Sequence, residues 1–307
     1  MNKNILVIGG TRFFGKLLVQ RLAMAGHKVT IATRGYAPDP FGTRVERIRV
    51  DRRNEAALRA AFRGARYDLV FDQMCYSPLD AAIAARVFAG KIDRYVVTST
   101  IDVYRGLLGS QDAPFKEDDL NVHAQPIDTG YAWHDPARAI ESYVPGKLQA
   151  EAYLCRDGTL PLVTARLGHV LGGQGDFTGR LAHYVDLVRA GAALRYTNAQ
   201  AATSLLAPQE AARFLAWVGG QSFEGPVNAA CDGALSAHGL YHKTAQLLDA
   251  QPRALKQHPG QAGALSPFDY PAPLALDTSR ATALGYRFGH SDEWLDDAIR
   301  QHDLAFV

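Results

Sequence analysis

The chain has 307 residues, of which 33 are basic and 31 acidic, and 47% are hydrophobic. This length suits one large domain or two closely packed ones, and the near balance of charge gives no argument for a general attraction to nucleic acid or to an anionic membrane, although it leaves room for local basic sites. No stretch approaches the roughly 20 apolar residues of a membrane span. The first residues show neither the apolar core nor the cleavage site of a signal peptide, and three widely spaced cysteines suit neither a disulfide framework nor a metal cluster. We therefore expect reduced thiols and a cytoplasmic location.

The amino-terminal segment is typical of a strand, a tight turn and a helix. An apolar run at Ile5–Ile8 ends on a glycine pair, and a helical pattern follows at about Phe14–Ala25. The glycines let the backbone turn sharply, and the N–H groups that open the helix form an anion site that fits a dinucleotide pyrophosphate. A tight turn without a ligand is the alternative. A regular glycine rhythm counted from Gly9 would have glycine at position 12, where this chain has arginine. The expected phosphate loop consists of Gly9, Thr11, Arg12, Phe13, Phe14 and Gly15.

Strand-like and helical patterns then alternate through the first hundred residues. Runs nearly continuous in Val, Ile and Leu suit parallel strands that are covered on both faces, and the crossovers between them require a right-handed, doubly wound sheet. We therefore predict an α/β fold with a doubly wound parallel Rossmann sheet, which binds ligands at the carboxyl ends of its strands. The further strands are expected at Val29–Thr33, Val45–Val50, Leu69–Asp72 and Tyr95–Ser99, and the helices at Glu55–Phe62 and Leu79–Ala89.

The end of the second predicted strand bears on the choice of cofactor. It reads Ala32-Thr33-Arg34-Gly35, whereas NAD sites usually have Asp or Glu here to bind the ribose hydroxyls. A 2′-phosphate needs positive charge, so Arg12 and Arg34 together favour NADP(H) over NAD(H). Each arginine taken alone is equally consistent with a solvated surface residue. Asp51, which closes the third strand, is a candidate partner for the adenine amino group, and an ordinary turn or capping carboxylate would look the same.

The rest of the chain indicates a second, discontinuous domain. We expect the dinucleotide-binding Rossmann domain at 1–170 plus about 201–232, and a smaller substrate-binding domain at about 171–200 plus 233–307. A long loop rich in Pro and Gly is expected between Gln251 and Pro273. The other elements are expected at Tyr143–Cys155, Leu162–Leu167, Thr178–Ala190, Thr203–Val218, Pro226–Ala230 and Asp292–Leu304.

Tyr143 and Lys147 form a candidate catalytic pair. They are four residues apart, so a helix would bring them to one face. An ammonium beside a phenol stabilises the phenolate and lowers the tyrosine pKa from about 10 towards the neutral range that a general acid–base needs. The fifth strand ends in a cluster of hydroxyls at Thr98, Ser99 and Thr100, at the sheet edge where a nicotinamide would arrive. A chance pair of this spacing is common, and the hydroxyl cluster is the reason to favour catalysis.

Further motifs follow these residues along the chain, including Arg166–Gly172, Pro226–Ala230 and Asp277–Arg280. Together with the glycine loop, the hydroxyl cluster and the Tyr143/Lys147 pair, they make nearly the whole chain resemble the extended short-chain dehydrogenase/reductase superfamily, which includes nucleotide-sugar epimerases, dehydratases and reductases. In that superfamily the catalytic hydroxyl lies four residues before the tyrosine that follows the fifth strand. That tyrosine is Tyr104 here, which selects Thr100 over Ser99. The arginine in the glycine loop is similar to that of NADP-preferring reductases.

The resemblance implies a role for each site residue. Tyr143 exchanges a proton with the substrate oxygen, Thr100 hydrogen-bonds that oxygen, and Lys147 binds the nicotinamide ribose and lowers the tyrosine pKa. The resemblance implies that the segment 72–76 after the fourth strand lines the cofactor, with ordinary packing as the alternative for Tyr76. His169 is a candidate for substrate contact, with a structural hydrogen-bonding role as the alternative. The resemblance implies further cofactor contacts from Gln73, Met74, Thr98, Leu167 and His169.

The chain departs from the superfamily pattern at the missing middle glycine of the loop, at Arg105 after Tyr104, and at Pro145. Pro145 lies between Tyr143 and Lys147, and proline inside a helix removes a hydrogen bond and clashes with the preceding turn. We therefore predict that the helix begins near Ser142, where the missing N–H would have no intrahelical partner. The long polar segment 105–136 is expected to be either a lid over the substrate or a surface excursion.

These observations predict an NAD(P)-dependent oxidoreductase or epimerase/dehydratase. It would transfer hydride at a hydroxyl or carbonyl group of a small-molecule substrate, with a nucleotide sugar as the candidate and NADP(H) preferred. The alternative is a non-catalytic, cofactor-sensing or RNA-associated member of the same superfamily, because the arginine-bearing loop also resembles that of plant chloroplast RNA-binding members. The near-neutral charge and the Thr100, Tyr143 and Lys147 set argue against nucleic acid as the partner. A homodimer is expected by analogy with the superfamily.

Overall fold

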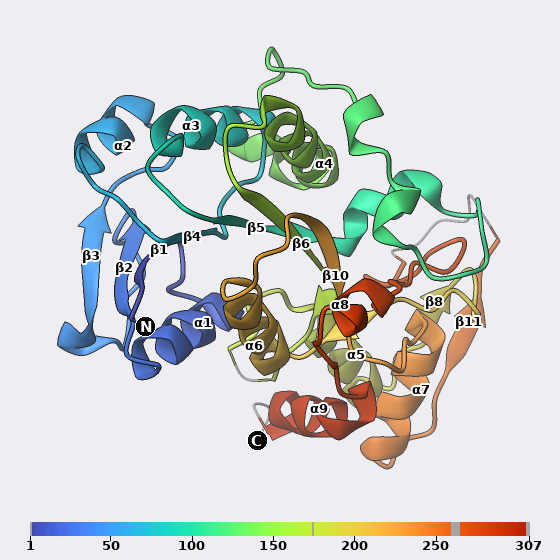
Figure 1. Ribbon diagram of the computed structural model, residues 1–307. Coiled ribbons are helices and arrows are strands. Elements are labelled where there is room, and N and C mark those ends of the chain that lie inside the picture. Colours follow the sequence, from blue (N-terminus) through green and yellow to red (C-terminus); the bar gives the residue numbers. More distant parts are fainter. Residues whose placement is uncertain (1, 174, 259–264, 305–307) are drawn as a thin grey trace. The chain divides into compact units, whose positions relative to one another are not determined.

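The computed structural model describes residues 2–173, 175–258 and 265–304 (Figure 1). The strands of its main sheet are β1 (Asn4–Ile8), β2 (Lys28–Thr33), β3 (Val45–Arg49), β4 (Leu69–Asp72), β5 (Tyr95–Thr100), β6 (Leu162–Leu167) and β10 (Gly225–Ala229). They lie in the order β10-β6-β5-β4-β1-β2-β3, and the pairs from β3 to β5 are parallel. The chain therefore reverses its direction of winding beside β1, and the predicted α/β fold with a doubly wound parallel sheet is confirmed.

Helices cover both faces of this sheet. On one face lie α2 (Glu55–Ala61), α3 (Pro78–Phe88) and α4 (Ala139–Asp157), and on the other lie α1 (Phe13–Met24) and α6 (Pro208–Val218) (Figure 1). Local sequence sets their ends: Ser77 caps α3 by accepting a hydrogen bond from the Asp80 N–H, with Pro78 in the first turn. Gly158, with φ of 64°, ends α4 in the left-handed conformation.

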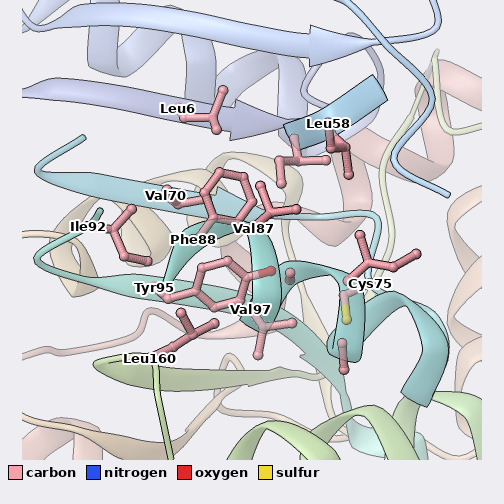
Figure 2. Close-up of a cluster of buried hydrophobic side chains, with 14 of the residues drawn as sticks. Leu6, Leu58, Val70, Cys75, Val87, Phe88, Ile92, Tyr95, Val97 and Leu160 are labelled. Carbon is pink, nitrogen blue, oxygen red and sulfur yellow. The ribbon is translucent and has the colours of Figure 1, made fainter. Parts of the chain in front are cut away.

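The core on the α2–α3–α4 face is built from alternate strand residues and the inner faces of the helices (Figure 2). Leu6, Val70 and Val97 point from the strands towards Val87 and Phe88 of α3, and all five are buried. The intervening strand residues are buried on the opposite face, which explains why these strands read as continuous apolar runs. The core fixes the strand ends, and with them the loops that carry the candidate site.

The chain divides into two compact units. Unit 1 comprises Met1–Val103, Asp118–Arg166 and Ala211–Val227, and unit 2 comprises Tyr104–Glu117, Leu167–Glu210 and Asn228–Val307. Unit 2 thus includes Tyr104–Glu117 together with 167–170, 201–210 and 228–232, all of which were expected in the Rossmann domain, and the domain boundaries stay a prediction.

Unit 2 contains short strands as well as helices. Its strands β7 (His169–Val170) and β9 (Leu205–Leu206) form one parallel pair, and β8 (Leu194–Tyr196) and β11 (Ala254–Lys256) form another. β11 lies in the segment expected to be one long loop, of which residues 259–264 fall outside the described residues. The helices of unit 2 are α5 (Arg180–Arg189), α7 (Ala237–Leu247), α8 (Ser279–Ala283) and α9 (Leu295–Asp303).

The predicted start of α4 near Ser142 is wrong. The helix begins at Ala139, directly after a 3₁₀ turn at Pro136–Arg138 that Asp135 caps by accepting the Ala137 N–H at 3.0 Å. The Asp135 cap, followed by Pro136 at the first position of the turn, favours helical backbone already at this point of the chain. Pro145 consequently lies inside α4, where the Glu141 carbonyl receives no N–H from it.

The segment 105–136 is divided between the two units. In unit 1, its later part packs on α4: Trp133 is buried, and the Asp128 N–H donates to the Gln149 side chain at 2.7 Å. A role as a lid stays a prediction. Within the described ranges, no helix combines the length and apolar character needed to cross a membrane.

Candidate active site

The phosphate loop has the backbone of a tight strand-to-helix turn. Gly9 and Gly10 have φ of 97° and 84°, which side chains rarely tolerate. A methyl group on Gly10 would lie 2.8 Å from Val19 of α1 and 2.9 Å from Val7 of β1, so this glycine also lets helix and strand approach each other. Arg12 has an extended backbone with φ of −130°, which any residue adopts. The glycine missing from position 12 therefore costs no strain.

Several features of unit 1 fit a bound dinucleotide. The side chain of Arg12, the N-cap residue of α1, does not cap the helix, and the first turn holds no acidic residue, so the start of this helix suits an anion. Gln73 and Thr98 are 8% and 7% exposed. Within the described residues, the buried Gln73 Nε2 and Thr98 Oγ1 atoms have no hydrogen-bond partner. Gln73 packs against the loop, because a methyl on Gly15 would come within 3.0 Å of its side-chain oxygen. Buried polar atoms of this kind call for a polar ligand.

The end of β2 carries more positive charge than the sequence analysis identified. Arg34 is exposed and lies over the Tyr36 ring at 5.0 Å, and Arg12 is also exposed. Arg49 of β3 is paired in register with Thr33, and its guanidinium packs on Gly35, where a methyl group would approach it to under 3.0 Å. In the part of the chain that the structure describes, none of the three guanidinium groups forms an ion pair. Arg49 is identified only by the register of β3 against β2, and no local sequence pattern predicts it.

Asp51 and Met74 were both predicted to contact the cofactor. The exposed Asp51 carboxylate accepts the Arg53 N–H at 2.9 Å, as an ordinary turn carboxylate does. Met74 lies beside the glycine loop, because a methyl group on Gly9 would be 3.0 Å from its side chain. Contact of either residue with a cofactor stays a prediction.

The structure places Lys147 of the predicted catalytic pair against β5 and Tyr143 beside Tyr76. Lys147 is buried, and its Nζ atom donates to the Thr98 carbonyl oxygen at 2.9 Å. The same Nζ lies 4.2 Å from the centre of the Tyr76 ring, and the Tyr76 and Tyr143 rings are 6.1 Å apart. Tyr143 is 37% exposed, so its ring is accessible to a substrate. Burial lowers the pKa of Lys147 by disfavouring its charged form.

The two neighbouring hydroxyls of β5 have different surroundings. Ser99 donates to Glu151, which forms a buried ion pair with Arg166 at 2.8 Å. Thr100 follows Ser99 and therefore points to the opposite face, where its hydroxyl donates to the Asp102 carboxylate at 3.0 Å. Ser99 is thus part of a structural network, which agrees with the preference for Thr100. The catalytic role of Thr100 stays a prediction.

A buried ion network supports the loop after β4, and the sequence analysis did not identify it. Arg52 forms ion pairs with Asp72 at the end of β4 and, at 3.0 Å, with Asp80 of α3. Asp72 accepts the Met74 N–H at 2.8 Å, and Asp80 accepts the Tyr76 N–H at 2.9 Å. The network therefore fixes both ends of the segment that carries Tyr76.

Leu167 and His169 lie in unit 2. Leu167 ends β6 and is buried. The buried His169 ring hydrogen-bonds Tyr270 at 3.0 Å through Nε2 and Arg180 at 3.2 Å through Nδ1. These contacts are consistent with a structural role for His169. Contact of Leu167 or His169 with a cofactor stays a prediction. No group of three or more His, Cys, Asp or Glu residues is arranged to hold a metal ion in residues 2–173, 175–258 and 265–304.

Comparisons with known proteins bear on the family. Residues 5–86 match the NAD dependent epimerase/dehydratase family. The 2'-dehydrokanamycin reductase of Streptomyces kanamyceticus is 35% identical over 97 residues, which are 32% of this chain and 27% of that protein. The chloroplast stem-loop binding protein of 41 kDa b of Arabidopsis thaliana is 27% identical over 132 residues, 38% of this chain and 33% of that protein. The chain thus covers about a quarter to a third of these relatives.

A solved structure extends the likeness to the whole fold. The UDP-glucose 4-epimerase of Thermus thermophilus, in complex with NAD, superposes with a TM-score of 0.69 at 19% identity, covering 96% of this chain and 98% of the epimerase. At this level of identity the likeness concerns the fold.

Proposed function

We propose that the chain, whose residues 5–86 match the NAD dependent epimerase/dehydratase family, is an NADP(H)-dependent member of that family that transfers hydride at a hydroxyl or carbonyl group of a small molecule. The observation that carries this proposal is the position of the Tyr143/Lys147 pair. α4 presents an accessible phenol at Tyr143, and its buried Lys147 ammonium is bonded to β5 at the Thr98 carbonyl. We propose a nucleotide sugar as the substrate class, supported by the fold likeness to the UDP-glucose 4-epimerase.

In the proposed reaction, the residues of this chain handle the proton. The Tyr143 hydroxyl exchanges a proton with the substrate oxygen, and Thr100 hydrogen-bonds that oxygen. The Lys147 ammonium favours the phenolate of Tyr143 by its charge, and its remaining donors can bind a ribose hydroxyl. When bound, the nicotinamide supplies or accepts the hydride. The unpartnered Thr98 hydroxyl and Gln73 amide would bind polar groups of the cofactor.

The preference for NADP(H) rests on Arg12, Arg34 and Arg49. A 2′-phosphate at the end of β2 would lie near three guanidinium groups. Within the described residues, none of these groups is paired with a carboxylate that would compete with the phosphate. The Thermus epimerase was solved with NAD, so the arginines of this chain are the reason to expect a different preference.

The catalytic part is tested by Tyr143→Phe. We expect kcat to fall by about 10² to 10⁴ while NADPH binding, measured by fluorescence, is retained, because the variant loses only the general acid–base. NADPH oxidation would be followed with a panel of oxidised nucleotide sugars and other carbonyl compounds. Turnover equal to that of the wild type would remove Tyr143 from the chemistry.

The cofactor preference is tested by Arg34→Ala and Arg49→Ala. We expect each to raise the Kd of NADPH about tenfold and to leave that of NADH unchanged, since a charge-assisted hydrogen bond is worth about 1.5 to 3 kcal/mol. Arg21→Ala, an exposed arginine in the last turn of α1, serves as the control. Equal losses for both cofactors, or none, would contradict the preference.

A second candidate function is RNA binding, which the similarity to the Arabidopsis stem-loop binding protein favours. An RNA stem-loop titrated at several salt concentrations tests it. Salt-dependent binding together with undetectable hydride transfer would reverse the order of the two candidates.

A further inference from the structure

We infer that Tyr76 is a positioning residue of the proposed site: its ring holds the Lys147 ammonium and the Tyr143 ring in place for proton transfer. This inference rests on the proposed function. Lys147 and Tyr143 are one helical turn apart on α4, and Tyr76 reaches both of them from the loop that follows β4. The sequence places Tyr76 in the segment 72–76, which is expected to line the cofactor, and gives no reason to link it to Lys147.

The Lys147 ammonium needs partners because it is buried. It has three N–H donors, and one of them binds the Thr98 carbonyl. The Tyr76 ring, 4.2 Å from Nζ, offers the negative face of its π system to the charge. A cation over an aromatic face is stabilised most where water is excluded. The ring therefore favours the charged form of Lys147, which the pairing with Tyr143 requires.

Tyr76 is held in place through its backbone. Its N–H donates to Asp80 at 2.9 Å, and its carbonyl oxygen lies against Gly146, where a methyl group would approach it to under 3.0 Å. Asp80 in turn binds Arg52 at 3.0 Å and His134 at 3.1 Å. Burial raises the pKa of Asp80, but the His134 hydrogen bond and the Arg52 charge outweigh it, so the pKa lies well below its usual range. The Asp80 carboxylate that accepts the Tyr76 N–H thus stays charged at neutral pH.

Other groups also act on the charge of Lys147. Cys75, Asp72 and Asp80 favour the ammonium when ionised, and Arg52 disfavours it. The phenol of Tyr143 lies beside the same ring. A test of Tyr76 must leave these groups unchanged, so it compares substitutions at Tyr76 alone.

The experiment compares Tyr76→Phe, which keeps the ring, with Tyr76→Leu, which removes it. Lysine labelled with ¹³C at Cε is titrated by NMR in the full chain, and the resonance that disappears in Lys147→Met identifies Lys147. We expect the pKa of Lys147 to be unchanged in the Phe variant and to fall by about one unit in the Leu variant, because the ring stabilises the charged form. Tyr76→Met, a flexible side chain without a ring, replaces Tyr76→Leu if the latter does not fold.

A second readout is the pH profile of kcat. In the NADPH-oxidation assay Tyr143 donates the proton, so its pKa sets the alkaline limb of the profile. The Leu variant should shift this alkaline limb to higher pH, because a less charged lysine lowers the tyrosine pKa less, whereas the Phe variant should keep the wild-type limb. An unchanged Lys147 pKa in the Leu and Met variants would overturn the inference, and so would an equal shift in the Phe variant. If Tyr143→Phe keeps full activity, the proposed function fails, while the NMR titration still decides the role of Tyr76.

Discussion

At the scale of single residues, Gly146 decides how closely the site can assemble. It lies between Tyr143 and Lys147 in α4, where glycine costs about 1 kcal/mol relative to alanine. A methyl group there would approach the Tyr76 carbonyl oxygen to under 3.0 Å and the Trp133 ring to 3.3 Å. The carbonyl belongs to a loop that is fixed by buried ion pairs, so it has little room to move. Glycine at position 146 therefore weakens the helix but allows α4 to contact the backbone of Tyr76.

Gly146→Ala should lower the free energy of unfolding by about 2 kcal/mol, as overpacking of a close contact does. Denaturant unfolding followed by circular dichroism measures the change. Gly106→Ala is the control, because no atom lies within 4 Å of a methyl group at that position and its φ is not positive. A Gly146→Ala variant as stable as the wild type would mean that the Tyr76 loop yields to the helix.

At the scale of secondary structure, ion pairs link neighbouring helices on one face of the sheet. Glu55 in the first turn of α2 accepts hydrogen bonds from Arg59 of the same helix at 2.9 Å and from Arg86 of α3 at 2.6 Å. The Arg86 hydrogen bond, with help from Arg59, lowers the pKa of Glu55 to about 2. The carboxylate also lies at the positive end of the α2 dipole.

Glu55→Gln should lower the free energy of unfolding at pH 7 by about 1 kcal/mol, a modest value because both arginines are about half exposed. The folded pKa is depressed, so the stabilisation is fully present above the unfolded value of 4.5 and is lost as the pH falls towards about 2. Unfolding of both proteins at several pH values measures this. A difference that stays constant down to pH 2 would contradict it.

The helix pattern predicted α4 but not its first residue. Proline was expected to fall near the helix start, and the capped 3₁₀ turn at Pro136–Arg138 instead begins the helical path earlier. α7 was not predicted, because its sequence between Ala237 and Leu247 mixes His, Tyr, Gly and Thr with few aliphatic residues. Burial of its Leu240 and Tyr241 faces compensates for this weak local preference.

At the scale of the whole molecule, unit 1 was predictable, whereas in unit 2 the helices α5 and α9 were predicted and the short strand pairs were not. The strands of unit 1 are long apolar runs covered on both faces, and such runs are visible in the sequence. Unit 2 pairs strands of two or three residues from distant segments, such as β8 with β11, and these are too short to carry a periodic signal.

The three cysteines, at positions 75, 155 and 231, are free.

The sequence by itself determined the doubly wound sheet, the glycine loop and the Tyr143/Lys147 pair, because each depends on local pattern and spacing along the chain. Only the tertiary structure decided which distant groups meet these residues. Strand register brings Arg49 to the end of β2, and the Arg52 network with the close approach at Gly146 brings Tyr76 onto the buried Lys147. Such contacts depend on packing between segments far apart in the chain, and local sequence carries no record of that packing.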